Sequence, residues 1–369
     1  MFTLSEEHVL LRDAARGFVQ DKMPTTHLRA LRDAGSRDGF DRALWAEIAA
    51  MGWTGILVPE EHGGAALGPM GLGLILQESG RTLAPSPLLS TAMIGASALT
   101  LGGTTAQQGL YLPKIADGSL IAALAVDETA HHAPHRLSTT AKSAGAGFTI
   151  SGKKTFVADG HVADLLIVAA QAPDGPALFL VPADAPGVTR AFLHTVDSRG
   201  AADIVFDAVA VDASARLQGG ADLIDAVLDR ARIGLAAEMV GQAQQAFEII
   251  SDYLKTRTQF GQLIGSFQAL QHRAAKILVE LELTQSCVTA ALDALESGRN
   301  DVAEYASLAK ARAAETLHLV TNEMVQMHGG IGMTDAHDSG LHMKRARVAE
   351  ALYGSAAFHR DRYASLNGF

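Results

Sequence analysis

The sequence predicts an α+β protein that is mostly α-helical, with three domains: an N-terminal helical domain (1–118), a middle β domain (119–218) and a C-terminal helical bundle (219–369). Two observations predict this order. In the first and last parts, apolar residues recur every three or four positions, which is the period of an amphipathic helix. Between these parts, short β-rich runs alternate with turn residues, which is typical of a small antiparallel sandwich or barrel.

The N-terminal domain begins with an amphipathic segment. Thr3 and Ser5 are residue types that cap helices, and the apolar residues from Val9 to Phe18 then repeat at spacings of three and four. Glycine and proline separate the later helices of this domain. We expect these helices over residues 41–51, 69–82 and 89–101.

The middle domain contains five runs that predict strands. They read LIAALAV, FTISGKKTFV, DLLIVAA, PALFLVPA and DIVFDAVAV. After them the helical period returns in two long segments, 222–256 and 270–292. Long helices with apolar stripes predict a four-helix bundle.

The composition excludes several classes of protein. A formal net charge of −10 argues against a nucleic-acid partner, because duplex binding depends on a basic face. No apolar run reaches the roughly 18 residues of a membrane-spanning helix, so no membrane partner is expected. The N-terminus lacks the basic-then-apolar order of a signal peptide. With a single cysteine, these features predict a cytoplasmic protein.

The stretch YLKTRTQFGQLIGSFQALQ, residues 253–271, places an arginine at a helical corner. Arg257 at such a corner forms charge-assisted bonds to a phosphate, while Phe260 lies against a flat ring and Gln268 bonds its polar edge. These three contacts, to a phosphate, to the face of a ring and to its polar edge, are the ones that a bound dinucleotide needs. The alternative is a capped helical hairpin with Arg257 on a solvated face.

A second glycine-rich turn, VQMHGGIGMTDAH at 325–337, follows another long helix. Backbone amides at glycines approach a phosphate or a ring closely. By itself the pattern is weak evidence, because loops that end a helix are more common than cofactor loops.

Together the two stretches resemble the signature regions of the acyl-CoA dehydrogenase family, R-x-x-F-G-x-x-I-x-x-F-Q and Q-x-x-G-G-x-G. PEEHGG at 59–64 is similar to a further motif of that family, and the order of domains matches over essentially the whole chain. The resemblance implies a flavoprotein that uses FAD to desaturate an acyl-CoA thioester and passes electrons to electron-transfer flavoprotein or a similar acceptor. It also implies a homo-oligomer, or a heterotetramer with a paralogous subunit, because the family binds FAD at a subunit interface.

The resemblance also assigns site residues. Those that would contact FAD are Arg257, Gln259, Phe260, Gln268, Gln326, Gly329, Gly330, Phe156, Val157, Ala158 and Ser355. Ala158 lacks the hydroxyl that family members usually carry there. Asp229, Arg232 and Tyr353 would meet the acyl-CoA, and Arg232 would offset the negative charge that develops as the α-proton leaves.

The catalytic base is missing from both of its usual positions. Abstraction of the α-proton requires a carboxylate in a dry pocket, and the family places a glutamate where this chain has Tyr353 or Ala231. A tyrosine is protonated at neutral pH, because its ordinary pKa is about 10. The remaining carboxylate candidates are Glu128, Asp229, Glu238 and Glu350.

Three functional alternatives follow. The chain is an acyl-CoA dehydrogenase with a base at an unusual position, or a subunit that depends on a catalytic paralogue acting on bulky acyl-CoA such as steroid side chains, or a flavin oxidase or monooxygenase on the same fold. His131, His132 and His135 lie in an expected loop without a second ligand cluster, so no metal site is predicted.

Overall fold

The computed structural model describes residues 4–369, so Thr3, one of the two predicted caps, lies outside the described residues. The chain divides into two compact units. We call them the helical unit (residues up to Arg29, 73–84 and 232–369) and the sheet unit (residues 30–72 and 85–231). The predicted fold class is confirmed, because helical segments precede and follow a β-rich middle part. The limits of the three domains stay a prediction.

The N-terminal helices begin at polar caps. The Ser5 side chain accepts a hydrogen bond from the backbone amide of His8, and Thr104 and Gln107 form a reciprocal capping box. The prediction missed the second and last of these helices, and 89–101 opens with a π-helical stretch, Leu89–Gly95. The helices are α1 (Glu6–Lys22), α2 (Thr25–Asp33), α3 (Arg42–Ala50), α4 (Gly68–Arg81), α5 (Ala96–Gly102) and α6 (Thr105–Ala116).

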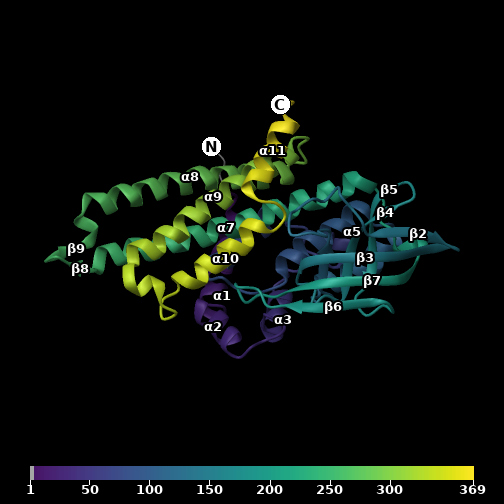
Figure 1. The fold of residues 1–369 in the computed structure, drawn as a ribbon, viewed down its shortest axis with the longest axis horizontal. Coiled ribbons are helices and arrows are strands. Elements are labelled where there is room, and N and C mark those ends of the chain that lie inside the picture. The colour runs from purple at the N-terminus through teal and green to yellow at the C-terminus, as the bar shows by residue number, and fades with distance from the viewer. Residues whose placement is uncertain (1–3) are drawn as a thin grey trace. The chain divides into compact units, whose positions relative to one another are not determined.

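The sheet unit is built around a seven-stranded sheet of order β1-β4-β2-β3-β7-β6, in which β5 also pairs with β4 (Figure 1). Apolar side chains such as Ile150, Phe179 and Phe206 form its buried core. Pairing is mainly antiparallel, but β1 and β2 each pair with β4 in parallel, which the strand pattern did not predict. The strands are β1 (Ala122–Ala125), β2 (Thr140–Ala144), β3 (Gly147–Ala158), β4 (Leu165–Ala172), β5 (Gly175–Pro182), β6 (Val188–Leu193) and β7 (Ala201–Asp212).

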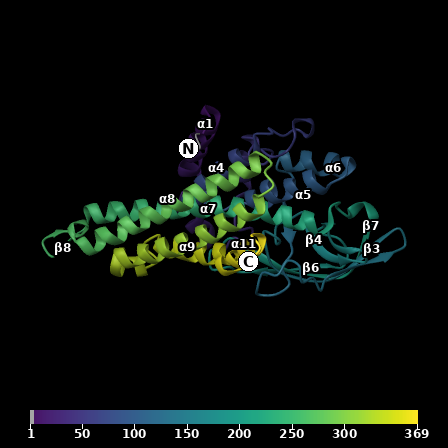
Figure 2. The same ribbon diagram turned by 90° about the horizontal axis from the view of Figure 1, so that it is seen from above.

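The C-terminal part consists of long helices. Within the helical unit α9 packs against α8, α10 and α11, and Figures 1 and 2 show α8 and α9 side by side. A short hairpin of β8 (Thr258–Gln259) and β9 (Gln262–Leu263) connects α7 to α8. The helices are α7 (Gly220–Thr256), α8 (Gln268–Glu296), α9 (Val302–His328), α10 (Ser339–Ala351) and α11 (Ala356–Leu366). No helix among residues 4–369 is long and apolar enough to cross a bilayer.

Two glycines bring α4 and α7 into backbone contact inside the helical unit. A Cβ atom on Gly241 would lie 1.7 Å from the carbonyl oxygen of Gln77, and one on Gly80 would lie 2.0 Å from that of Glu238. No side chain fits at either position. The two helices therefore pack closely where α7 carries Glu238, one of the candidate bases.

Candidate functional site

Phe156 is presented at the surface of the sheet by a β-bulge. The register of β3 against β7 shifts between Lys154 and Val157, and Phe156 has a φ of 51° and is 39% exposed. Asp203 of β7 holds this conformation, because its Oδ1 accepts hydrogen bonds from the Thr155 hydroxyl at 2.7 Å and the Phe156 amide at 3.1 Å. A bulge redirects a side chain in this way at many functional sites.

The charge of Asp203 suits this role. Burial acts to raise its pKa, but hydrogen bonds from Lys153, Thr155 and the Phe156 amide lower it below its ordinary value. The carboxylate therefore stays ionised at neutral pH. Sequence reasoning placed Asp203 in a strand and missed this function, because the two partners come from strands 48 residues apart.

The next two predicted flavin contacts differ in exposure. Val157 is buried in the sheet core, whereas Ala158 is only half-buried. Val157 therefore has only its backbone to offer a ligand on the surface of the sheet. Asp159 follows with a positive φ and hydrogen-bonds the hydroxyl of Ser90. Sequence reasoning missed this contact as well.

The Arg257 corner is an exposed hairpin at the end of α7. The backbone amide of Ile264 donates to the Arg257 carbonyl at 2.9 Å, and Ile264 is the buried anchor of the turn. Phe260, at the tip, has a φ of 54° and is 91% exposed. Arg257, Gln259 and Gln268 are exposed beside it. An apolar ring so exposed fits a contact outside this chain.

The second predicted loop follows α9. Gly329 has a φ of 63°, which favours glycine, and Gln326, Gly329 and Gly330 are exposed. A Cβ atom on Gly329 or Gly330 would meet nothing within 4 Å. The space in front of both glycines is therefore open to a ligand or a partner chain.

The expected base position lies in the turn between α10 and α11. Tyr353 has a φ of 56° and is nearly buried. Its carbonyl oxygen accepts hydrogen bonds from Arg232 Nε at 3.2 Å and His359 Nε2 at 3.1 Å. Lys310 Nζ donates to the Gly354 carbonyl at 2.9 Å. Three fully buried basic side chains thus surround this turn, and Ser355 caps α11 directly after it.

The surroundings change the protonation of these basic groups. Burial and the nearby Arg232 lower the pKa of Lys310 to about 7. Burial, Arg232 and Lys310 lower the pKa of His359 to about 2, so that this imidazole is neutral at physiological pH. The turn is therefore held by hydrogen bonds from the basic groups while their total positive charge is limited.

Glu128 is the first of the four candidate bases. It contacts the fully buried Lys154 at 2.7 Å and accepts backbone hydrogen bonds from Ser138 and Thr139. Burial acts to raise its pKa, but the Lys154 hydrogen bond and the two amides lower it to about 2. A carboxylate with so low a pKa is a weak base.

Two further candidates are also in ion pairs. Glu238 lies opposite Arg345, whose Nη2 is 2.9 Å from Glu238 Oε1, and both side chains are buried. Glu350 accepts a hydrogen bond from Arg347 at 2.7 Å. Its second oxygen is 3.2 Å from His318 Nδ1. Both carboxylates are therefore already engaged in pairs within this chain.

The last candidate, Asp229, is 4% exposed on α7, two residues before the fully buried Ala231. Asp229 raises the pKa of the adjacent Arg230, although burial of Arg230 lowers that pKa by more. Because α7 continues to Arg232, both predicted acyl-CoA contacts of this helix lie within one turn. Asp229 also interacts with other groups of this chain, so its candidacy as a base is tested by substitution.

Two histidines of the loop contact acidic side chains. His132 Nδ1 lies 2.8 Å from Asp127, and His135 Nε2 lies 3.3 Å from Asp225. No group of three or more histidine, cysteine, aspartate or glutamate side chains in residues 4–369 is arranged to hold a metal ion.

Family models match nearly the whole chain. The N-terminal, middle and C-terminal domains of acyl-CoA dehydrogenase match residues 5–119, 123–209 and 218–365. The chain belongs to the acyl-CoA dehydrogenase family. This acyl-CoA dehydrogenase is therefore a flavoprotein oxidoreductase that acts on acyl-CoA and uses FAD.

Relatives of this acyl-CoA dehydrogenase are found among curated proteins and solved structures. Acyl-CoA dehydrogenase FadE12 of Mycobacterium tuberculosis is 32% identical over 365 residues, covering 94% of this chain and 92% of the relative. A variant of the Tcur3481-Tcur3483 steroid ACAD has a TM-score of 0.92 at 35% identity, covering 99% and 98% of the two chains. The ChsE4-ChsE5 complex from M. tuberculosis has a TM-score of 0.93 at 27% identity, covering 100% and 99%.

The residues of this acyl-CoA dehydrogenase fit FAD at two places. In the sheet unit, the bulge presents an exposed phenylalanine ring, which suits the face of an isoalloxazine. In the helical unit, the open space at Gly329 and Gly330 admits close approach of a ligand to the backbone. The assignment of individual residues to FAD stays a prediction.

Proposed function

We propose that this chain is one subunit of a heteromeric FAD-dependent acyl-CoA dehydrogenase, and that a carboxylate of a paralogous subunit removes the α-proton. In this proposal the chain binds FAD and acyl-CoA and lacks the base. The electrons taken from the substrate pass to electron-transfer flavoprotein or a similar acceptor. A cytoplasmic location remains a prediction from the sequence.

One observation carries the proposal: the expected base position holds Tyr353, and three of the four candidate carboxylates are in ion pairs within the chain. Glu128 pairs with Lys154, Glu238 with Arg345 and Glu350 with Arg347. A base must be free to accept a proton from the substrate, and a carboxylate held in an ion pair has to break that pair first.

The chain's own residues have defined functions in this proposal. Phe156 packs on the flavin, and Asp203 fixes the bulge that presents its ring. Arg232 lies near the thioester and offsets the negative charge that develops there. FAD, when bound, accepts the hydride that leaves the β-carbon. The remaining requirement is the removal of the α-proton.

Two relatives support the heteromeric assignment. The Tcur3481-Tcur3483 steroid ACAD and the ChsE4-ChsE5 complex are each described by two polypeptide names. By similarity to the first, we propose a bulky acyl-CoA, such as a steroid side-chain thioester, as the substrate class.

The proposal is tested by anaerobic reduction of the flavin. The chain is purified alone and after co-expression with each paralogue of this fold that has a glutamate in one of the two base positions. Flavin absorbance is then followed after addition of acyl-CoA thioesters from butyryl to steroid side-chain. We expect bleaching by a complex and none by the chain alone. Equal bleaching by the chain alone overturns the proposal.

Two substitutions separate the remaining alternatives. If Asp229 is the base of a self-sufficient enzyme, Asp229→Asn abolishes bleaching by the chain alone. If the chain lacks a base but is otherwise competent, Tyr353→Glu restores a carboxylate at the position where the family places its base. We then expect slow substrate-dependent bleaching of the flavin by this variant and none by Tyr353→Gln. Bleaching by the Gln variant would show that the introduced carboxylate is not responsible.

A further inference from the structure

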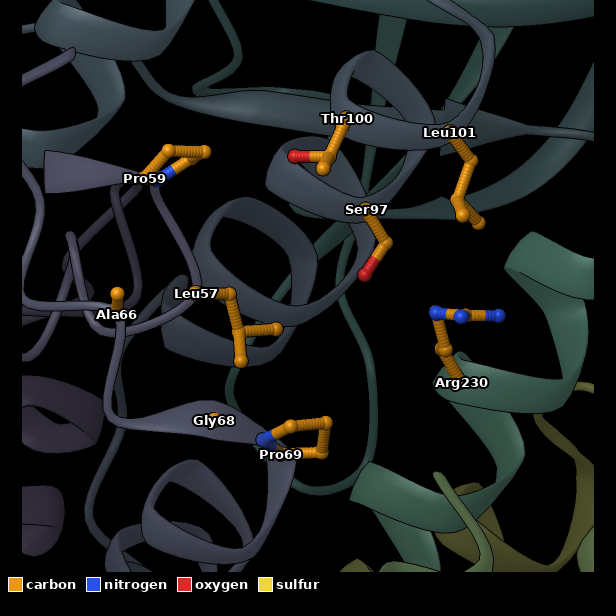
Figure 3. A pocket seen from close by; sticks show the side chains of 9 residues that line it. All are labelled: Leu57, Pro59, Ala66, Gly68, Pro69, Ser97, Thr100, Leu101 and Arg230. Carbon is orange, nitrogen blue, oxygen red and sulfur yellow. The ribbon is translucent and has the colours of Figure 1, made fainter. Parts of the chain in front are cut away.

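A pocket of about 300 Å³ opens in the sheet unit, and none of the residues assigned above to FAD or acyl-CoA lines it. Its walls come from the segment 57–69 around the PEEHGG motif, from α5 and from α7. Figure 3 shows the side chain of Arg230 rising from α7 below Ser97 and Leu101, with Leu57 and Pro69 across the same open space. A volume of about 300 Å³ is at the lower end for small-molecule sites.

Arg230 contributes a positively charged guanidinium to this pocket, and most of its N–H donors make no hydrogen bond to the described chain. Its Nη1 donates to the Ala226 carbonyl at 3.0 Å. A guanidinium has five N–H donors, and the others have no acceptor among residues 4–369. Burial lowers the pKa of Arg230 and the charge of Asp229 opposes this change, but an arginine remains protonated at neutral pH. Arg230 lines the pocket, so these donors are available to a ligand there.

Ser97 supplies a second polar group. The residue is 5% exposed, and within the described chain its hydroxyl has no hydrogen-bonding partner. In Figure 3 this hydroxyl points into the space that Arg230 enters. This hydroxyl is therefore available to hydrogen-bond a ligand oxygen in the pocket.

The rest of the wall selects among anions. Leu57, Pro59, Pro69 and Leu101 give the pocket a mainly apolar lining. A single guanidinium balances one negative charge, so the site suits a monoanion better than a doubly charged phosphate. The matching ligand is a small carboxylic acid with an apolar substituent. Its carboxylate would bind the guanidinium, and its apolar part would pack against the aliphatic side chains of the wall.

The pocket lies on a different face of α7 from the predicted acyl-CoA contact. Successive residues of an α-helix are separated by about 100°, so Arg230 and Arg232 point about 160° apart around the helix axis. We propose that the Arg230 pocket is a second ligand site that binds a small apolar carboxylic acid as its anion. The observation that carries it is the combination of a cavity, free guanidinium donors and an unpartnered hydroxyl.

Isothermal titration of the purified full-length protein with benzoate and cyclohexanecarboxylate tests this site. Benzamide is the uncharged control, and inorganic phosphate tests for a doubly charged anion. We expect saturable binding of one carboxylate per chain, no binding of benzamide and weaker binding of phosphate. Arg230→Met should weaken carboxylate binding at least tenfold, whereas Arg42→Met, at an exposed arginine paired with Asp38, should leave it unchanged.

A second variant keeps the test valid if Arg230→Met does not fold. Leu101 is 47% exposed, so Leu101→Trp is tolerated by the fold and fills the pocket without altering the guanidinium. This variant should also lose binding. Unchanged carboxylate binding in Leu101→Trp, binding of benzamide as tight as benzoate, or tighter binding of phosphate would each overturn the proposal.

Discussion

The ion pair between Glu128 and Lys154 shows how a residue that resembles a catalytic group can have a structural function. Lys154 is fully buried, and its Nζ also donates to the Val126 carbonyl at 2.9 Å. The sequence offered Glu128 as a candidate base but could not show its pairing with the lysine, because the two residues are 26 positions apart. Pairing of this kind depends on tertiary structure and has no local pattern.

Glu128→Gln therefore tests whether the Glu128 carboxylate has a structural or a catalytic function. The substitution leaves Lys154 buried without its carboxylate, and breaking a buried pair from one side costs about 3–5 kcal/mol. We expect a loss of unfolding free energy of this size in urea denaturation, whereas Glu61→Gln on the exposed PEEHGG loop should change it by less than about 0.5 kcal/mol. A fully stable Glu128→Gln variant contradicts the structural function.

Lys310 predicts a pH dependence of stability. Its pKa falls from 10.5 to about 7 on folding, so between these values the unfolded chain binds more protons than the folded chain. The contribution of Lys310 to the unfolding free energy therefore rises with pH from about 7 to 10.5, with a slope approaching about 1.4 kcal/mol per pH unit. Below pH 7 its contribution is constant.

Urea denaturation at several pH values checks this expectation. Lys310→Met removes the titrating group, so the difference between wild type and variant should rise over the same window. Loss of the bonds to the Gly354 and Glu350 carbonyls lowers the stability of the variant at every pH and does not affect the slope. Parallel curves for the two proteins would contradict the lowered pKa.

At the scale of elements, local patterns predicted the long helices well and the sheet less completely. The segments 222–256 and 270–292 follow the helical period and became α7 and α8. β2 and β6 were missed because at least half of their residues are exposed and they carry no apolar run. The bulge at Phe156 was not predictable either, because Asp203 of a distant strand fixes it.

The contact between α4 and α7 gives a prediction with an internal control. In Gly241→Ala the added methyl group meets the Gln77 carbonyl, so the helices must separate, and we expect a loss of about 3 kcal/mol or more. Gly17→Ala on α1 meets nothing within 4 Å and should stabilise the protein by about 0.5–1 kcal/mol. Thermal unfolding monitored by circular dichroism measures both, and equal effects would contradict the packing argument.

At the scale of the whole molecule, several predicted FAD contacts are exposed in the single chain. Phe260 and Met333 are large apolar side chains with most of their surface in solvent, each next to one of the two glycine-containing motifs. The family resemblance implied a cofactor shared between subunits, and this exposure fits that arrangement. Which chain covers them is not encoded in local sequence, because a subunit interface depends on the surfaces of both partners.

Phe260→Ala tests whether the Phe260 ring contributes to FAD binding without contributing to the stability of the single chain. The ring is 91% exposed, so its removal should change the unfolding free energy of the chain by less than about 0.5 kcal/mol. We expect the FAD content per chain, measured by absorbance after gel filtration, to fall well below that of wild type. Leu10→Ala, at another exposed apolar position, is the control. Full FAD content in Phe260→Ala would exclude this ring from the cofactor site.

The division of the chain into its two units has a consequence for biosynthesis. The helical unit needs residues up to Arg29, the segment 73–84 and everything from Arg232 to the C-terminus. At about 5–20 residues per second, the ribosome needs roughly 15 to 60 s to proceed from residue 84 to residue 369. The sheet unit is complete once Ala231 has left the ribosome. The sheet unit can therefore fold during translation, whereas the first helix has its full set of packing partners only after the segment from Arg232 onward has been synthesised.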